Sequence, residues 1–177
     1  MKSEKIKELT MLGMLTAIVV LLQLVVRIRF GVFSLSTVLV PIVIGAALYG
    51  VGAGAWLGLV FGAVVLLSGE AAFFLGLNAP GTIVLVIVKG VACGAAAGVV
   101  YKILKKKNDK VAAVAASIVC PVVNTGVFLV LSMVFFNYDL RYVLTAFIGV
   151  NFFIELAVNA LLSSTIIFLI KKAKTTH

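Results

Sequence analysis

Long apolar runs alternate along this chain with short polar segments, and each run is close to the length that spans a membrane. Six runs can be laid out in order, over residues 9–26, 35–49, 51–68, 82–104, 111–136 and 142–170. A helix needs about 20 predominantly apolar residues to cross the hydrocarbon core of a bilayer. The pattern therefore predicts an all-α integral membrane protein, with a single membrane domain over residues 1–177 that forms a bundle of six transmembrane helices.

The composition agrees with this pattern. Of the 177 residues, 63% are hydrophobic and 12% are charged, whereas about 25% of a soluble domain is charged. A soluble domain of this size could not bury so much apolar surface. The first run is too long for the hydrophobic region of a signal peptide and ends in "RIRF" rather than in small residues, so we expect it to remain as a helix.

Lysines gather in three clusters, and each cluster flanks an apolar run. The clusters are Lys2, Lys5 and Lys7; Lys102, Lys105, Lys106, Lys107 and Lys110; and Lys171, Lys172 and Lys174. With six spans, all three clusters fall on one side, and cytoplasmic loops of membrane proteins are rich in lysine and arginine. We therefore expect both termini on the cytoplasmic side of the membrane. The net charge of +9 is then explained by topology in a lipid bilayer rather than by nucleic-acid binding.

One apolar run carries a polar stripe. In "NFFIELAVNA", the residues Asn151, Glu155 and Asn159 are four positions apart and so share one face of a helix. A carboxylate at membrane depth is costly, and its presence is a functional-site hypothesis by default. At about 1.5 Å per residue, Asn151 and Glu155 are within reach of the outer loops. Asn159 lies about 6 Å deeper, and we expect it to bridge helices there.

Other polar and aromatic residues reach the same level of the expected bundle. We predict a solute pocket in the outer half of the membrane, closed by the outer loop "AAFFLGLNAPG". An alternative stays open, in which a lysine and a glutamate of this set pair with each other and the asparagines form hydrogen bonds between helices. In that alternative, Lys89 pairs with Glu155. The predicted pocket residues are Lys89, Asn124, Asn151, Glu155, Asn78 and Phe74.

Small residues recur at every fourth position in two of the runs. Gly54, Gly58 and Gly62 form one series, and Gly90, Gly94 and Gly98 form the other. Small residues at this spacing let helix backbones approach closely in lipid, so we expect them to pack helices within this protein.

Motifs for catalysis and nucleotide binding are absent from the sequence. It contains no G-x-x-x-x-G-K-[ST], no H-E-x-x-H and no G-x-S-x-G, and its single histidine is His177. Cys93 and Cys120 lie inside apolar runs and are expected to be reduced, packed side chains. We therefore expect no enzyme, no catalytic residues, no metal site and no cofactor. An active pump built on this chain would take its energy from another subunit.

The run "STVLVPIVIGAALYGVGAGAWLGLVFG" and the following "NAPGT" are similar to the substrate-binding S components of energy-coupling factor (ECF) vitamin importers. Within that family the chain most resembles the riboflavin and pantothenate types. The resemblance implies a multi-pass protein of the bacterial cytoplasmic membrane, a six-helix bundle that captures a small water-soluble vitamin from outside. It also implies partners, namely a coupling transmembrane subunit and two ATPase subunits.

The first run offers a docking position for such a partner. The family's docking motif is Ala-x-x-x-Ala, and this chain has Gly13-Met-Leu-Thr-Ala17 at the same spacing. Two small residues one turn apart make a shallow groove for a partner helix. The alternative is that Gly13 and Ala17 pack inside this protein.

The solute itself is left open by the sequence. A buried Lys89 favours an anionic or carbonyl-rich solute, so pantothenate and a flavin both fit, as does a nucleobase-like precursor. A second functional class is a small channel or ion-coupled secondary transporter in which Glu155 carries a proton or cation. A membrane enzyme or assembly factor is disfavoured because no catalytic constellation is present.

Overall fold

The computed structural model describes residues 2–25, 29–30, 33–34, 37–137, 139 and 150–175. Within these ranges, the side chains of residues 2–4, 29–30, 33–34, 150–151 and 174–175 are not described. Helices lie over all six of the apolar runs. They are α1 (Lys2–Val25), α2 (Leu39–Tyr49), α3 (Val51–Leu67), α5 (Ala79–Leu104), α6 (Asp109–Phe136) and α8 (Val150–Thr175).

Four of these helices are long and apolar enough to cross a membrane. They are α1, α5, α6 and α8, while α2 and α3 are shorter apolar helices of 11 and 17 residues. Gly50 alone separates α2 from α3, and its φ of +92° belongs to a region that L side chains rarely adopt. The structure thus has the helical character that was predicted, and the passage of all six helices through the membrane stays a prediction.

Three small elements were not expected from the apolar pattern. The loop after α3 contains a six-residue helix, α4 (Ala72–Leu77). The strands β1 (Arg29–Phe30) and β2 (Phe33–Ser34) pair in antiparallel fashion and form a short hairpin in a structure that is otherwise helical.

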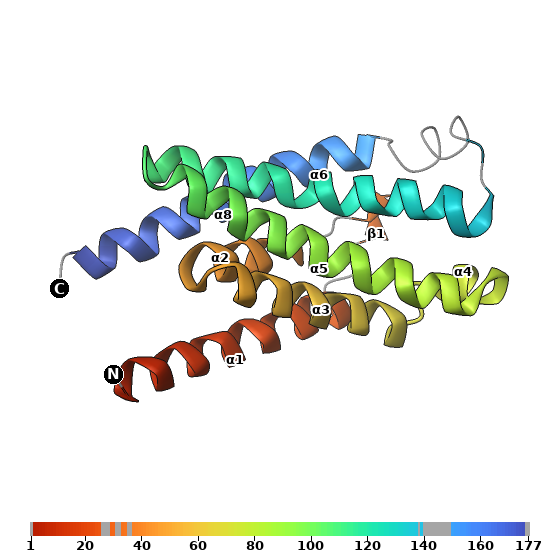
Figure 1. Ribbon diagram of the computed structural model, residues 1–177, viewed down its shortest axis with the longest axis horizontal. Helices are drawn as coiled ribbons and strands as arrows, with labels where there is room; N and C mark the ends of the chain where they lie inside the picture. Colours follow the sequence, from red (N-terminus) through yellow and green to blue (C-terminus); the bar gives the residue numbers. More distant parts are fainter. Residues whose placement is uncertain are drawn as a thin grey trace.

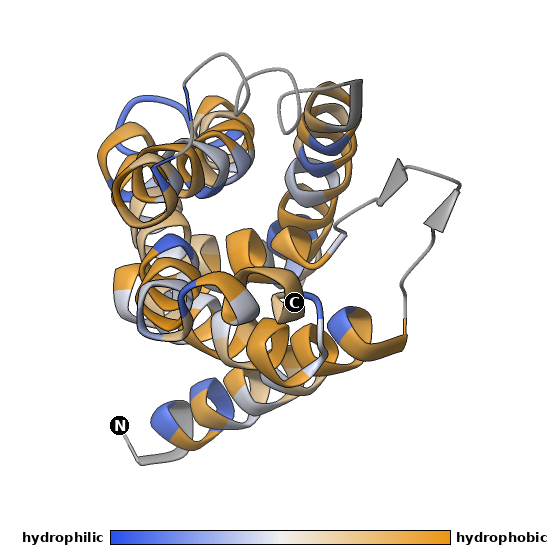
Figure 2. Cartoon of the chain, turned by 90° about the vertical axis from the view of Figure 1, so that its right-hand side faces the viewer, coloured by the Kyte–Doolittle hydropathy of each residue, from blue (hydrophilic) through white to orange (hydrophobic). Residues whose placement is uncertain are grey.

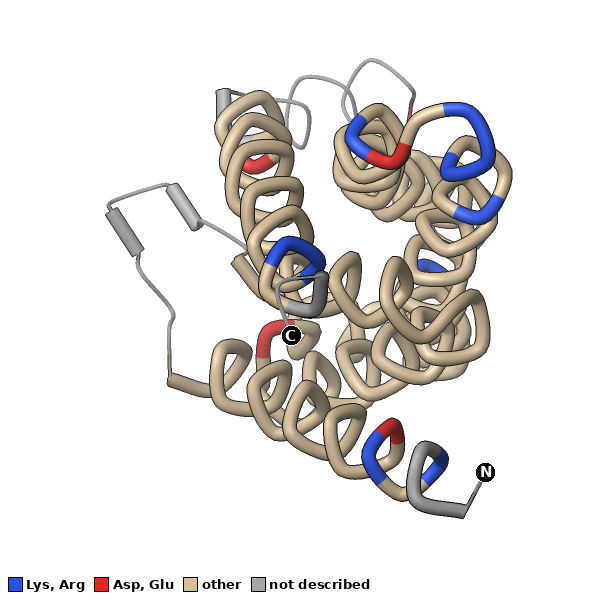
Figure 3. The backbone as a smooth tube through the Cα atoms, turned by 90° about the vertical axis from the view of Figure 1, so that its left-hand side faces the viewer, with Lys and Arg blue, Asp and Glu red and all other residues tan. Residues whose placement is uncertain are grey.

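The two termini lie at the same end of the bundle as the turn between α5 and α6, and α4 lies at the opposite end (Figure 1). In the view onto the end with the termini, lysine-rich segments lie at the start of α1, at the α5–α6 turn and at the end of α8 (Figure 3). Large apolar side chains such as Leu9, Leu161 and Val25 are exposed on the outside of the bundle. Apolar residues dominate the helices in the hydropathy view (Figure 2). This distribution suits helices surrounded by lipid.

The helices α3 and α5 are in direct backbone contact through the two glycine series. A Cβ added at Gly58 would collide with the carbonyl oxygen of Gly90, and one added at Gly94 would collide with that of Gly54. A Cβ at Gly62 would come within 2.8 Å of the carbonyl oxygen of Val86. The glycines therefore pack this protein's own helices, as the sequence predicted.

A proline inside α6 is compensated by a residue of α8. Pro121 has no N–H, so the carbonyl oxygen four residues earlier, on Ser117, receives no hydrogen bond from it. The Asn159 side chain donates from Nδ2 to that oxygen at 3.0 Å. Ser163 donates in turn to Asn159 Oδ1 at 2.6 Å. The expectation that Asn159 bridges helices is confirmed.

Candidate functional site

Lys89 lies in the middle of α5, ten residues after its start, between two aromatic rings. Its Nζ is 5.5 Å from the ring centroid of Phe61 on α3 and 5.5 Å from that of Phe128 on α6. An ammonium at this distance is attracted to the ring quadrupole. The glycine contact between α3 and α5 brings the Phe61 ring within reach, because it leaves little space between the two backbones.

Two carboxylates act on Lys89 without forming an ion pair with it. Glu70 and Glu155 both interact electrostatically with the ammonium. Within the described part of the chain, no ion pair joins Lys89 to either of them. Glu70 instead accepts a hydrogen bond of 2.5 Å from Gln23 Nε2 on α1. The alternative in which Lys89 and Glu155 form a closed structural pair is therefore not what the geometry shows.

Two acceptor oxygens near the middle of the bundle have no hydrogen bond. Asn124 Oδ1 on α6 and Glu155 Oε1 on α8 are buried atoms with no partner among the residues that the structure describes. A buried polar atom without a partner costs about 1–3 kcal/mol, and more if it is charged. Such atoms are positions at which a ligand's N–H or O–H group would be bound favourably.

Aromatic rings connect the surroundings of Lys89 to the end of the bundle that carries α4. The Phe74 ring on α4 lies 5.7 Å from that of Phe128 and 5.3 Å from that of Phe136. Phe73 packs edge-on against Phe74 at 5.4 Å. Phe128 therefore touches both the Phe74 cluster and Lys89, and it joins the loop residue to the interior residue.

Asn78 has a local structural task at this end. Its Oδ1 accepts a hydrogen bond from the backbone N–H of Gly81, so it caps the start of α5. Its Nδ2 donates to the carbonyl oxygen of Phe135 on α6 at 3.2 Å. The side chain thus ties α5 to α6 beside the Phe74 cluster. Its predicted role in solute binding has no contact of its own to support it.

The structure brings together only part of the predicted set. Lys89, Glu155 and, through Phe128, Phe74 belong to one region, and Asn124 adds an unpaired acceptor on α6. The Asn151 side chain lies outside the described residues, although its backbone belongs to α8. Four further residues of this region were not predicted from the sequence, namely Gln23, Glu70, Phe61 and Phe128. Gln23 could have been found, because a glutamine inside an apolar run needs a hydrogen-bond partner.

The exposed face of α1 carries the predicted docking residues. Gly13 and Ala17 are both exposed, and a Cβ added at Gly13 would have nothing within 4 Å. The alternative that these two residues pack against other described helices is therefore not supported, in contrast to the glycines of α3 and α5. Docking itself stays a prediction. On the same helix, Thr16 accepts a hydrogen bond of 3.2 Å from Trp56 Nε1 on α3.

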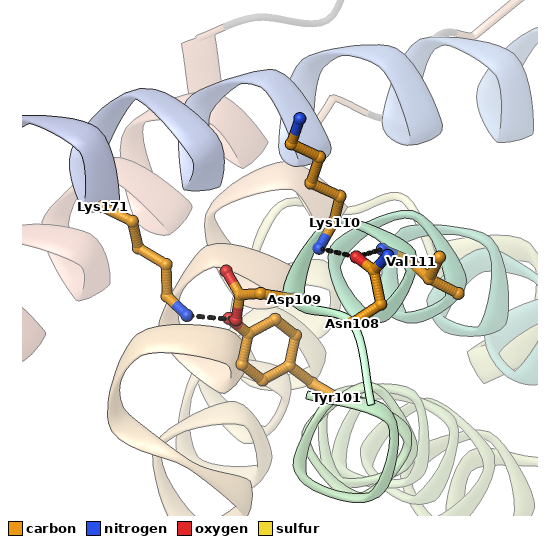
Figure 4. A network of polar contacts seen from close by, with 6 residues as sticks. All are labelled: Tyr101, Asn108, Asp109, Lys110, Val111 and Lys171. Atoms are coloured by element: carbon orange, nitrogen blue, oxygen red, sulfur yellow. Dashed lines mark hydrogen bonds and ion pairs between the residues drawn. The ribbon is translucent and has the colours of Figure 1, made fainter. Parts of the chain in front are cut away.

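The residues that line a hollow of about 1090 Å³ belong to segments at the end of the bundle with the termini, opposite α4 (Figure 1). It is formed by α1, the α2–α3 turn and the end of α5, so it is distinct from the predicted solute pocket. Close to it, Tyr101 donates to Asp109 Oδ1 at 2.7 Å, and Lys171 forms an ion pair with the same carboxylate (Figure 4). This network ties together the ends of α5, α6 and α8.

Within the described ranges, no group of three or more His, Cys, Asp or Glu residues could hold a metal ion.

Comparison with known proteins gives one family. The sequence model of the family described as "ECF transporter, substrate-specific component" matches residues 7–169. No curated protein matches the chain.

Proposed function

Because this chain belongs to the family of substrate-specific components of ECF transporters, we propose that it captures a small water-soluble vitamin or related micronutrient, of the pantothenate or riboflavin type, outside a bacterial cell. Members of this family are transporter subunits rather than enzymes. The proposal places the solute among α3, α5, α6 and α8, in the half of the bundle nearer α4. It places the termini on the cytoplasmic side, in agreement with the lysines gathered at that end.

The observation that carries the proposal is that Lys89 forms no ion pair with a carboxylate of the described residues. Its ammonium is held against two phenylalanine rings, with no ion pair to Glu70 or Glu155 among the described residues. A lysine inside a membrane bundle is expensive, and such residues mark solute pathways. A carboxylate or carbonyl oxygen of the solute would give this ammonium its charge-assisted hydrogen bond.

The remaining residues give the pocket its complementary groups. Glu155 and Asn124 each offer a buried oxygen that could accept from a hydroxyl, amide or imide of the solute. Asn151 stands one helical turn before Glu155 and belongs to the same face of α8. Phe74 supplies an apolar wall toward α4, and Asn78 holds that end of the pocket. A solute with both oxygen acceptors and N–H or O–H donors fits this set.

Energy for uptake would come from partners. In this proposal a coupling transmembrane subunit docks on the exposed face of α1 at Gly13 and Ala17, and two ATPase subunits drive the cycle. The open space beside Gly13 supports this assignment, because a partner helix could approach the α1 backbone closely there.

The decisive experiment is to identify small molecules released from the purified protein by mass spectrometry, followed by calorimetric titration with each candidate. We expect one vitamin-like compound to bind at a ratio of one to one. Uptake in vesicles should require the coupling subunit and the ATPases. Uptake driven by an ion gradient in their absence would instead support a secondary transporter in which the unpaired Glu155 carries the coupling ion.

A further inference from the structure

The hollow at the end with the termini combines an apolar floor with a basic rim. The floor includes Ala46, Ala47 and Val51, at the place where α2 turns into α3. On the side of α1, Ile6 and Met11 line the hollow and are exposed at its opening. Its volume of about 1090 Å³ is as large as sites that hold sizeable organic ligands, which measure about 300–1,000 Å³.

Four lysines surround this hollow, and one carboxylate opposes them. Lys102, Lys105 and Lys106 come from the end of α5 and the turn after it, and Lys7 comes from α1 with Glu8. Lys105 and Lys106 directly follow the last residue of α5, within four positions of Lys102. Tyr49 adds a phenol to the same rim. The balance of charge around the hollow is therefore strongly positive.

Topology alone does not explain this convergence. The positive-inside rule requires lysines at this end of the bundle, but it does not require them to face one hollow. Lys107 and Lys110 lie in the same segment and meet the rule without lining it. Lys110 instead places its Nζ 5.2 Å from the ring centroid of Phe168. The segment therefore separates lysines that line the hollow from lysines that do not.

We propose that this hollow is a binding site for one anionic phospholipid of the cytoplasmic leaflet. The phosphate group would be held by Lys102, Lys105 and Lys106, with the glycerol end of the acyl chains on the apolar floor. Basic pockets between transmembrane helices on the cytoplasmic side are suited to anionic headgroups. The mixed lining selects a lipid over a free anion, because a free anion would leave the apolar floor without a partner. The site is independent of the solute bound near Lys89.

The test uses the full chain purified in detergent and native mass spectrometry. Phosphatidylglycerol and phosphatidylcholine with identical acyl chains are added in equal amounts, and bound lipid is counted. We expect one phosphatidylglycerol per chain to be retained in preference to phosphatidylcholine, and high salt to weaken its retention. Equal retention of the two lipids would overturn the proposal. So would binding of inorganic phosphate as tight as that of the lipid, because the site would then be a free-anion site.

Matched double variants locate the site. Lys105→Gln with Lys106→Gln removes two charges from the rim, and Lys107→Gln with Lys110→Gln removes two charges beside it. The first pair should weaken phosphatidylglycerol binding about tenfold or more, and the second should leave it within about twofold. Equal effects of the two pairs would contradict the assignment. If the first pair fails to fold, Lys105→Arg with Lys106→Arg should retain binding, and the lipid selectivity of the wild type still decides the question.

Discussion

Asn159 of α8 donates a hydrogen bond to the carbonyl oxygen of Ser117, a bond that Pro121 of α6 cannot donate because it has no N–H. The Asn159 Nδ2 lies 3.0 Å from the carbonyl oxygen of Ser117, and Pro121 is the residue whose N–H would otherwise bind there. Asn159 is 1% exposed, and its own oxygen is occupied by Ser163. The α6–α8 contact therefore rests in part on a defect in one helix that the other repairs.

Asn159→Ala is expected to lower the free energy of unfolding by about 1–3 kcal/mol, because it leaves the Ser117 carbonyl without a partner. Chemical denaturation in detergent measures this. Pro121→Ala restores a backbone donor to the same oxygen, so the Asn159→Ala cost should shrink in that background. Equal costs in both backgrounds would show that the two residues are independent. Ser164→Ala, which removes only a bond within α8, serves as the control.

Gly58→Ala is expected to destabilise the bundle by about 1–3 kcal/mol, because the new Cβ collides with the Gly90 backbone and neither helix can rotate it away. The matched control on the same helix is Gly52→Ala. Nothing lies within 4 Å of its Cβ, so alanine should be neutral or stabilising there, by up to about 1 kcal/mol. Thermal unfolding in detergent compares the two variants. A similar loss of stability in both variants would mean that the contact with the Gly90 backbone does not determine the effect of the substitution.

Lys89→Met should weaken solute binding about 10- to 100-fold, because a hydrogen bond to a charged group contributes about 1.5–3 kcal/mol. Its fold should persist, since no ion pair of Lys89 is broken among the described residues. Calorimetric titration with the identified solute measures the affinity, and Lys107→Met in the turn after α5 is the control. A second variant, Lys89→Met with Glu155→Gln, should fold and bind no better than Lys89→Met alone. Native affinity in this double variant would place the solute nearer the outer loops.

Gly13→Leu and Ala17→Leu should each abolish transport while leaving solute binding to the isolated protein near the wild-type level, because both positions face outward on α1. Gly13→Ala recreates Ala-x-x-x-Ala and should transport as the wild type does. Vesicle uptake with the complete set of subunits measures transport. Loss of solute binding in the leucine variants would instead assign these residues to the interior.

The sequence predicts the features of this protein that follow from spacing and depth. Asn159 could be assigned to a helix-bridging role because it lies on the Asn151–Glu155 face but deeper in the membrane. The fourfold glycine spacing of α3 and α5 indicated close packing for the same kind of reason. The free carbonyl four residues before Pro121 could also have been predicted from the sequence, since a proline inside a helix leaves that acceptor without its backbone donor.

The neighbours of Lys89 could not be predicted in this way. Its contact with Phe61 and Phe128 depends on how three helices are rotated about their axes, and hydrophobic periodicity is nearly uninformative when a helix is apolar on every side. The tie between Gln23 and Glu70 joins residues 47 positions apart, across a chain reversal that spacing does not encode. For Lys89 and Glu155, opposite charge suggested a pair that the helix geometry does not make.

The glycine contact joins α3 and α5 into one rigid unit. Carbonyl oxygens of each helix occupy the places where the other would carry a Cβ, so neither helix can slide or roll without displacing its neighbour. Trp56 of α3 donates a hydrogen bond to Thr16 of α1, the helix that carries Gly13 and Ala17. Lys89 belongs to α5, the other helix of this unit. Any displacement of α3 along its axis must therefore carry α5, and with it Lys89, in the same direction.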